Sequence, residues 1–158
     1  MVGVGVGVVV AVGVAMKRIP LKRGGRLRKQ SKESIAKLQR RLWVLCKLIT
    51  RKLHGNECYT CGMKNLEGSN WQTGHMISKA SCGALLKYDL RNLRPQCSIC
   101  NLFRGGEGAT FVRNMIIREG QEYVDGIFKD RNVIVKAKDH YEMLVAKYQL
   151  MLEDLNAQ

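Results

Sequence analysis

Two short cysteine pairs are the residues best suited to chemistry in this 158-residue chain. Cys58 and Cys61 form one Cys-x-x-Cys motif, and Cys97 and Cys100 form the second. Each motif spaces two sulfur atoms so that they can share one tetrahedral zinc ion, and two motifs supply four thiolates. A site closed by four sulfurs leaves no position open for a substrate, so the spacing predicts a structural Zn²⁺ ion.

The alternative to a zinc site is a pair of disulfides or free thiols in a core. The segment between the pairs has few apolar residues, and a metal would help it to hold one conformation. Gly62 follows the first pair, where a tight turn is expected. Cys82 lies outside both motifs and is interpreted as a bystander, and Cys46 as an inert core thiol of a helix.

Three polar residues are interleaved with the cysteines. His75 lies between the pairs, Asn92 lies just before the second pair, and Asn101 directly follows the last cysteine. Histidine is suited to general base catalysis near neutral pH, and amide oxygens are ligands for hard cations such as Mg²⁺. A His-Asn-Asn set arises often by chance, so its meaning comes from its order within the cysteine frame. A structural zinc ribbon with an incidental histidine is the alternative.

The charge of the chain is concentrated in one segment. The formal net charge is +14, and residues 17–53 hold 14 Lys or Arg against one acid, Glu33. Such a balance favours a polyanionic partner, either nucleic acid or an anionic membrane surface. The residues predicted to contact DNA are Lys17, Arg18, Lys22, Arg23, Arg26, Arg28, Lys29, Arg40, Lys47 and Arg51.

Residues 1–30 are predicted to be a low-complexity, basic and disordered arm. Residues 1–16 are Val, Gly, Ala and Met without charge, a run too short and too rich in glycine for a transmembrane helix. In a signal peptide the positive charge precedes the apolar run, whereas here Lys17 and Arg18 follow it. We therefore expect no membrane partner and a cytoplasmic location.

Helices are predicted on both sides of the cysteine-containing segment. Residues 31–53 show a helical apolar period, with Ser31 as the cap and Gly55 as the stop. Further helices are predicted at 109–119, at 121–130 and at 139–156. The apolar positions of the first helix are Ile35, Leu38, Leu42, Leu45, Ile49 and Leu53, and those of the last are Tyr141, Leu144, Tyr148, Leu152 and Leu155. The last helix could pack within the monomer or form a dimer interface.

Residues 56–108 are predicted to be irregular apart from one short strand that ends at His75, where side chains alternate. The predicted fold class is α+β. It is a single domain over 31–158, with its core at 56–108 and flanking helices at 31–53 and 109–157.

Several segments resemble a known family. WQTGH75, LKYDLRNLRPQCSICN101 and GQEYVDGI resemble the NinG family of lambdoid phages, also called Rap, from about Leu42 to the C-terminus. The ordered His75, Asn92 and Asn101 also resemble the HNH, or ββα-metal, nucleases, and the Cys-x-x-Cys-Asn element resembles the Holliday-junction endonuclease of T-even phages. The resemblance implies a zinc-bound ββα-metal core and a phage recombination endonuclease that cuts branched DNA, such as Holliday junctions, in the host cytoplasm.

The resemblance also implies roles for the polar residues. His75 would be the general base, Asn101 a ligand of a catalytic Mg²⁺ or Mn²⁺ ion, and Asn92 the residue that stabilises the loop and orients His75. Gly74 stands where many HNH enzymes have an acidic metal ligand. Gln72 stands where related phage sequences have an acid or Gln, and it is a candidate ligand of this ion. Asp89, or as the weaker alternative Glu107, is predicted to supply the missing carboxylate from a loop.

Other readings stay open at this point. One is a non-catalytic zinc-ribbon protein that binds DNA, and another is an HNH nuclease with a different DNA substrate. A basic protein of membrane surfaces would leave the cysteine pairs unexplained. Symmetric cutting of a four-way junction would favour a homodimer.

Overall fold

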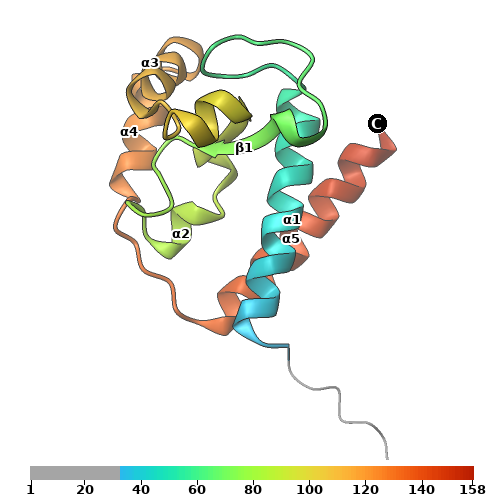
Figure 1. The fold of residues 1–158 in the computed structure, drawn as a ribbon. Helices are drawn as coiled ribbons and strands as arrows, with labels where there is room; N and C mark the ends of the chain where they lie inside the picture. Colours follow the sequence, from blue (N-terminus) through green and yellow to red (C-terminus); the bar gives the residue numbers. More distant parts are fainter. Residues whose placement is uncertain (1–32) are drawn as a thin grey trace, which may run out of the picture. The chain divides into compact units, whose positions relative to one another are not determined.

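The computed structural model describes residues 33–158 (Figure 1). The predicted arm at 1–30, with its basic residues from Lys17 to Lys29, lies outside the described residues, as does Ser31. Within 33–158 the chain is a mixed α+β structure with one two-stranded sheet, as the sequence predicts. The elements in chain order are α1 (Ile35–His54), η1 (Gly68–Asn70), β1 (Trp71–His75), α2 (Ala84–Lys87), η2 (Leu90–Asn92), β2 (Leu93–Cys97), η3 (Ile99–Phe103), α3 (Gly108–Glu119), α4 (Gln121–Lys129) and α5 (Lys138–Ala157).

Helix α1 begins at Ile35, the first residue of its apolar period, and so later than the predicted start at residue 31. Ser34 is its N-cap, because the Ser34 side chain accepts a hydrogen bond from the amide of Lys37 at 3.3 Å. The predicted cap at Ser31 is therefore replaced by a second serine in the same stretch. The helix ends at His54, and Gly55 follows it with φ of 68°, which confirms the predicted stop.

The first core forms between α1 and α5, which lie side by side (Figure 1). The side chains that share it are Leu38, Leu42, Cys46 and Ile49 of α1, Tyr88 and Leu93, and Tyr141, Val145 and Tyr148 of α5. The Tyr148 hydroxyl donates to the carbonyl oxygen of Tyr88 at 3.0 Å. The apolar face of the last helix thus packs against α1 of the same chain.

None of the helices within 33–158 has the length and apolar composition needed to cross a bilayer.

The segment predicted to be irregular contains a second strand. β2 pairs antiparallel with β1, and the register aligns Trp71 with Cys97 and His75 with Leu93. Pro95 makes this strand hard to predict from the sequence. Proline has no amide hydrogen to donate to a neighbouring strand, so within sheets it is confined mainly to edge strands. In a two-stranded sheet both strands are edges, and the Pro95 carbonyl accepts from the amide of Tyr59 at 2.8 Å.

A second core lies under α3 and α4 and is tied to the sheet by a buried arginine. Phe111, Met115, Val124 and Ile127 are its fully buried members from these helices. Arg94 of β2 is 2% exposed and pairs with Glu119, the last residue of α3, at 2.8 Å. This ion pair holds β2 against the C-terminal end of α3.

Candidate metal centre and active site

The four paired cysteines converge on one point. Their sulfur atoms all lie within 4.8 Å of one another, and those of Cys61 and Cys97 are 3.8 Å apart. Sulfurs that share a tetrahedral zinc at bonds of about 2.3 Å lie about 3.8 Å apart, so the arrangement can hold a metal ion such as Zn²⁺. The six cysteines, all within residues 33–158, are free thiols in this structure.

Local structure prepares these sulfurs for a metal. Gly62 adopts φ of 75° and its amide donates to the Cys58 carbonyl at 2.9 Å, which forms the predicted tight turn. The Tyr59 amide donates to the Pro95 carbonyl at 2.8 Å, which ties the first pair to β2, and Cys97 of the second pair is the last residue of that strand. Trp71, Leu66 and three of the cysteines form a small buried cluster around the centre.

The thiols of the centre differ in acidity. Burial raises the pKa of the Cys58 thiol, but hydrogen bonds from the backbone at Cys61 and Cys97 outweigh burial and bring that pKa to about 7. Burial raises the pKa of the Cys61 and Cys100 thiols. A bound dication would reverse that effect by attracting the thiolate form.

His75 is held in place by two contacts. Its Nε2 atom lies 3.0 Å from the carbonyl oxygen of Lys87, and its ring stacks on that of Trp43 with centroids 5.3 Å apart. A carbonyl oxygen can only accept, so Nε2 carries the proton and Nδ1 of the neutral ring carries the lone pair. The tautomer and the orientation of the ring are therefore fixed by α2 and α1.

The environment of His75 keeps it neutral. Burial lowers the pKa of His75 to about 4, the Lys87 carbonyl opposes that change, and the positive charges of Lys79 and Lys87 add to it. At neutral pH the ring is therefore neutral, and its Nδ1 atom is able to accept a proton.

Asn92 stabilises the loop that joins the two strands through its side-chain hydrogen bonds. It is fully buried, and its Oδ1 atom accepts from the Ile77 amide at 2.8 Å. Its Nδ2 atom donates to the carbonyls of Ile77 and Leu86, each at 3.1 Å. Leu86 directly precedes Lys87, whose carbonyl holds His75. Asn92 thus reaches His75 through the backbone of α2.

Asn101 and His75 line the same shallow cavity. The cavity has a volume of about 220 Å³ and includes Thr73, Lys79 and Gly106. Asn101 is the third residue of the short helical turn η3. The Thr73 hydroxyl oxygen is buried and has no hydrogen-bond partner among residues 33–158. The amide oxygen of Asn101 and the hydroxyl oxygen of Thr73 are both neutral atoms that suit a hard cation, and both belong to residues that line this cavity.

The structure does not bring Asp89 or Gln72 to this cavity. Asp89 lines a pocket toward α5, and Arg91 donates to its carboxylate at 2.6 Å and 2.9 Å. Gln72 lies on the opposite face of β1 from His75, because successive strand residues alternate, and its amide donates to the Ser69 carbonyl. The expectation that either residue supplies the missing metal ligand is therefore corrected.

The absence of an acid at position 74 has a physical reason. The side chain of Gln96 occupies the space beside Gly74, and a Cβ atom at Gly74 would overlap it. Gln96 is itself fully buried and donates to the carbonyl of Gly106 at 2.8 Å and to the Thr60 hydroxyl. This strand position can hold only glycine while Gln96 links the two strands to the loop after η3.

The basic residues predicted on the first helix are exposed. Arg40 and Lys47 lie on the side of α1 that carries Trp43, whereas Arg51 stacks over Trp71 with its guanidinium carbon 5.4 Å from the ring centroid. Arg51 also donates to Asn56 at 3.3 Å. Arg51 thus contacts a tryptophan ring and an asparagine. Among residues 33–158, Arg40 and Lys47 make no contact of either kind.

Sequence reasoning missed three residues around His75. Trp43 stacks on its ring, the Lys87 carbonyl accepts from it, and Lys79 lines its cavity. The available signal was an aromatic residue between the basic residues Arg40 and Lys47 on one helix face.

Together, the fold and the site define a small α+β protein with four clustered cysteines that could bind a metal, beside a cavity lined by His75 and Asn101. The chain belongs to the NinG family, since the family model described as Bacteriophage Lambda NinG protein matches residues 16–158. Protein ninG of Escherichia phage 933W is 34% identical over 98 residues, which are 62% of this chain and 47% of that relative. Protein ninG of Escherichia phage lambda is 32% identical over 98 residues, with the same coverage.

The chain matches about half the length of these curated relatives. No solved structure matches this chain.

Proposed function

We propose that this protein is a metal-dependent endonuclease that hydrolyses phosphodiester bonds in branched DNA, such as Holliday junctions, during phage recombination. The observation that carries the proposal is His75, which is neutral, fixed in one tautomer and placed with Asn101 in one cavity beside a four-cysteine centre. The resemblance of this ordered set to the HNH nucleases supports the same reading.

His75 would act as the general base. With Nε2 bound to the Lys87 carbonyl, Nδ1 is the atom that would accept a proton from the attacking water. The stacked ring of Trp43 keeps the imidazole plane in one orientation, so the base needs no reorganisation when DNA binds. Asn92 would act as a positioning residue, because it holds the backbone on both sides of the His75 contact.

A Mg²⁺ or Mn²⁺ ion would neutralise charge at the scissile phosphate and at the leaving oxygen. Asn101 and Thr73 would hold it through an amide and a hydroxyl oxygen. The paired cysteines are the only cluster of Cys, His, Asp and Glu in residues 33–158 that is close enough to bind a metal, so no carboxylate cluster serves this ion there. Octahedral Mg²⁺ keeps several waters and commonly takes phosphate oxygens, so the substrate itself would complete the shell.

The four cysteines would hold a structural Zn²⁺ ion. This ion would fix η3, and with it Asn101, against the end of β2, because Cys100 directly precedes Asn101. The zinc would therefore set the geometry of the cavity without touching the substrate.

DNA would bind through the basic segment. Arg40 and Lys47 are exposed on α1, and the arm at 1–30 would add contacts to phosphates that read no sequence. A homodimer, which two symmetric cuts would favour, is part of the proposal and does not depend on the α5 face that packs on α1.

The test is incubation of purified protein with a labelled four-way junction and a matched duplex, in Mg²⁺, in Mn²⁺ or in EDTA. We expect cleavage of the junction with either cation and none in EDTA or with His75→Ala. Deletion of residues 1–30 should weaken binding and reduce its salt slope by roughly 0.9 per lost phosphate contact on duplex DNA.

A non-catalytic zinc-containing DNA-binding protein is the second candidate. The observation in its favour is that the cavity residues Thr73, His75, Ser78, Lys79, Asn101, Leu102, Gly105 and Gly106 include no carboxylate. It predicts junction binding in EDTA with no cut product at any concentration of Mg²⁺ or Mn²⁺.

A further inference from the structure

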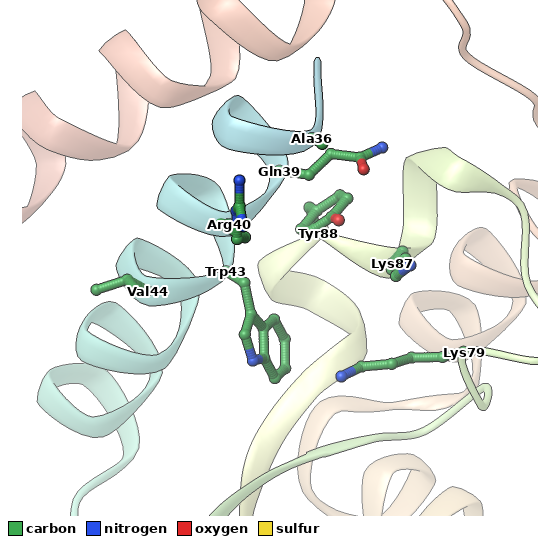
Figure 2. Close-up of a pocket in the computed structure, with 8 residues that line it drawn as sticks. All are labelled: Ala36, Gln39, Arg40, Trp43, Val44, Lys79, Lys87 and Tyr88. Carbon is green, nitrogen blue, oxygen red and sulfur yellow. The ribbon is translucent and has the colours of Figure 1, made fainter. Parts of the chain in front are cut away.

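A groove outside the His75 cavity lies between α1 on one side and Lys79 with the C-terminal end of α2 on the other. It has a volume of about 580 Å³, and Trp43, Val44 and Tyr88 supply its apolar part (Figure 2). Arg40, Lys79 and Lys87 supply its charge. A volume of this size falls within the range of about 300–1,000 Å³ that small-molecule sites occupy.

The groove adjoins the His75 cavity through two shared contacts. Lys79 lines both hollows. Trp43 lines the groove with one part of its indole and stacks on the imidazole of His75, with ring centroids 5.3 Å apart. A chain that passed from the groove to the cavity would therefore run over Trp43 and Lys79.

The charge of the groove is one-sided. Its lining residues include three cations and no acid. The Lys79 ammonium lies 3.8 Å from the centroid of the Trp43 ring, and the two side chains point toward each other (Figure 2). Burial and the neighbouring charges of Lys87 and Lys47 lower the pKa of Lys79, and an anion placed among these groups would offset their mutual repulsion.

We infer that this groove binds an unpaired nucleotide of the DNA strand whose phosphate enters the His75 cavity. The base contacts the indole of Trp43, and Arg40 and Lys87 hold the flanking phosphates. Lys79, which is exposed, leaves the ring to pair with the backbone of the strand. The inference deepens the proposed function, on which it rests, by naming the substrate feature that the site takes.

The chemistry favours a single strand over a duplex. A base in a duplex is already stacked on its neighbours, whereas an unpaired base gains a stacking partner on an aromatic side chain. Alternating cations and aromatic faces are the usual composition of single-strand sites, and stacking is tolerant of sequence. Opening of a base pair at the branch point of a DNA junction would present such an unpaired base.

The experiment measures tryptophan fluorescence in EDTA, where no cleavage occurs. The probes are an oligo(dT) of about eight nucleotides, within the usual site size, and an abasic oligonucleotide with the same number of phosphates. We expect the oligo(dT) to quench the emission and the abasic strand to bind about 5- to 100-fold more weakly without quenching. Trp43→Phe should remove the quenching, because only Trp71 then emits.

Charge variants test the groove without touching Trp43. Arg40→Gln and Lys87→Gln should each weaken oligo(dT) binding, and Lys52→Gln, an exposed cation of the same helix outside the groove, should leave it unchanged. Equal affinity for oligo(dT) and the abasic strand, or quenching that survives in Trp43→Phe, would overturn the inference.

The two proposals fail separately in this design. If the protein cuts junctions and oligo(dT) does not quench the fluorescence of Trp43, the protein is an endonuclease without this nucleotide site. A protein that passes the fluorescence test and cuts nothing has the site and lacks the proposed activity.

Discussion

The Nε2 atom of His75 lies 3.0 Å from the carbonyl oxygen of Lys87, the last residue of α2. This contact joins the end of β1 to a one-turn helix that lies in the loop between the strands. It leaves Nδ1 as the basic atom and makes the orientation of the ring depend on the position of a backbone group. Mutation of Lys87 cannot remove this group, whereas changes in the loop can move it.

Replacement of His75 by alanine should remove cleavage and spare the fold. We expect the rate of junction cleavage to fall by about 10²–10⁴, the usual contribution of a positioned acid–base group. Zinc content and junction binding should stay at the level of the parent protein, since His75 belongs to neither the cysteine centre nor the basic face of α1. Single-turnover cleavage at saturating DNA and metal provides the measurement, and an unchanged rate would reject His75 as the base.

Asn92→Ala should damage the structure more than the chemistry. The change removes three hydrogen bonds and leaves the amide and the carbonyl of Ile77 without these partners, whereas the Leu86 carbonyl keeps its bond from the Asp89 amide at 3.3 Å. Each such group costs about 1–3 kcal/mol, so the free energy of unfolding should fall by several kcal/mol in urea titrations. Asn156→Ala, an exposed change on α5, serves as the control. A loss no larger than that of the control would show that the loop does not depend on Asn92.

Loss of the cysteine centre should unfold the protein. We expect one zinc per chain in purified, reduced protein, and Cys97→Ser or a strong chelator should remove most of the about 5–15 kcal/mol that stabilises a domain of this kind. Cys82→Ser is the matched control, because Cys82 packs against the second core and lies outside the centre. Metal analysis and thermal melts distinguish the two variants. Folded, reduced protein without zinc would refute the assignment.

Gly74→Ala should be destabilising because of Gln96. The new methyl group would overlap the Gln96 side chain, at a cost of about 1–3 kcal/mol typical of overpacking. In a Gln96→Ala background the same change should cost less, with a coupling of at least about 0.5 kcal/mol. Gly126→Ala, where the added methyl group meets nothing within 4 Å, should be neutral or stabilising. Additive costs in the double variant would contradict the proposed overlap.

Acidification should destabilise the fold through two half-buried histidines, His54 and His75. Burial lowers the pKa of both His75 and His54 to about 4, whereas in the unfolded chain each titrates near 6.5. Between about pH 6.5 and pH 4 the unfolded state binds protons that the folded state does not, so stability falls as the pH falls. His75→Gln should reduce this slope by up to about 1.4 kcal/mol per pH unit, measured with zinc in excess. Equal slopes would mean that His75 is protonated in the folded state.

The metal centre and the long helices follow from local sequence. A Cys-x-x-Cys motif specifies the distance between its own two sulfurs, and the conformation of Gly62 completes the turn. The apolar periods of α1 and α5 predict which faces are buried, because helical geometry relates residues three and four apart. These features therefore appeared at nearly the predicted positions, with the start of α1 moved from Ser31 to Ser34.

The surroundings of His75 were decided by tertiary structure. Trp43 reaches the histidine from α1, and Lys87 reaches it from α2, so no local period relates either residue to His75. The sequence suggests Asp89 as a metal ligand, whereas in the fold Arg91 donates to its carboxylate and Asp89 lines a pocket toward α5. The sequence likewise suggests that an acid is missing at Gly74, whereas the fold places the Gln96 side chain of β2 beside that position.

The distinction has a single physical cause. Turns, caps and helical faces depend on a few consecutive residues, whose spacing the sequence displays directly. The acidity, orientation and partners of a site residue depend on side chains from separate elements, and these meet only after the whole chain has packed.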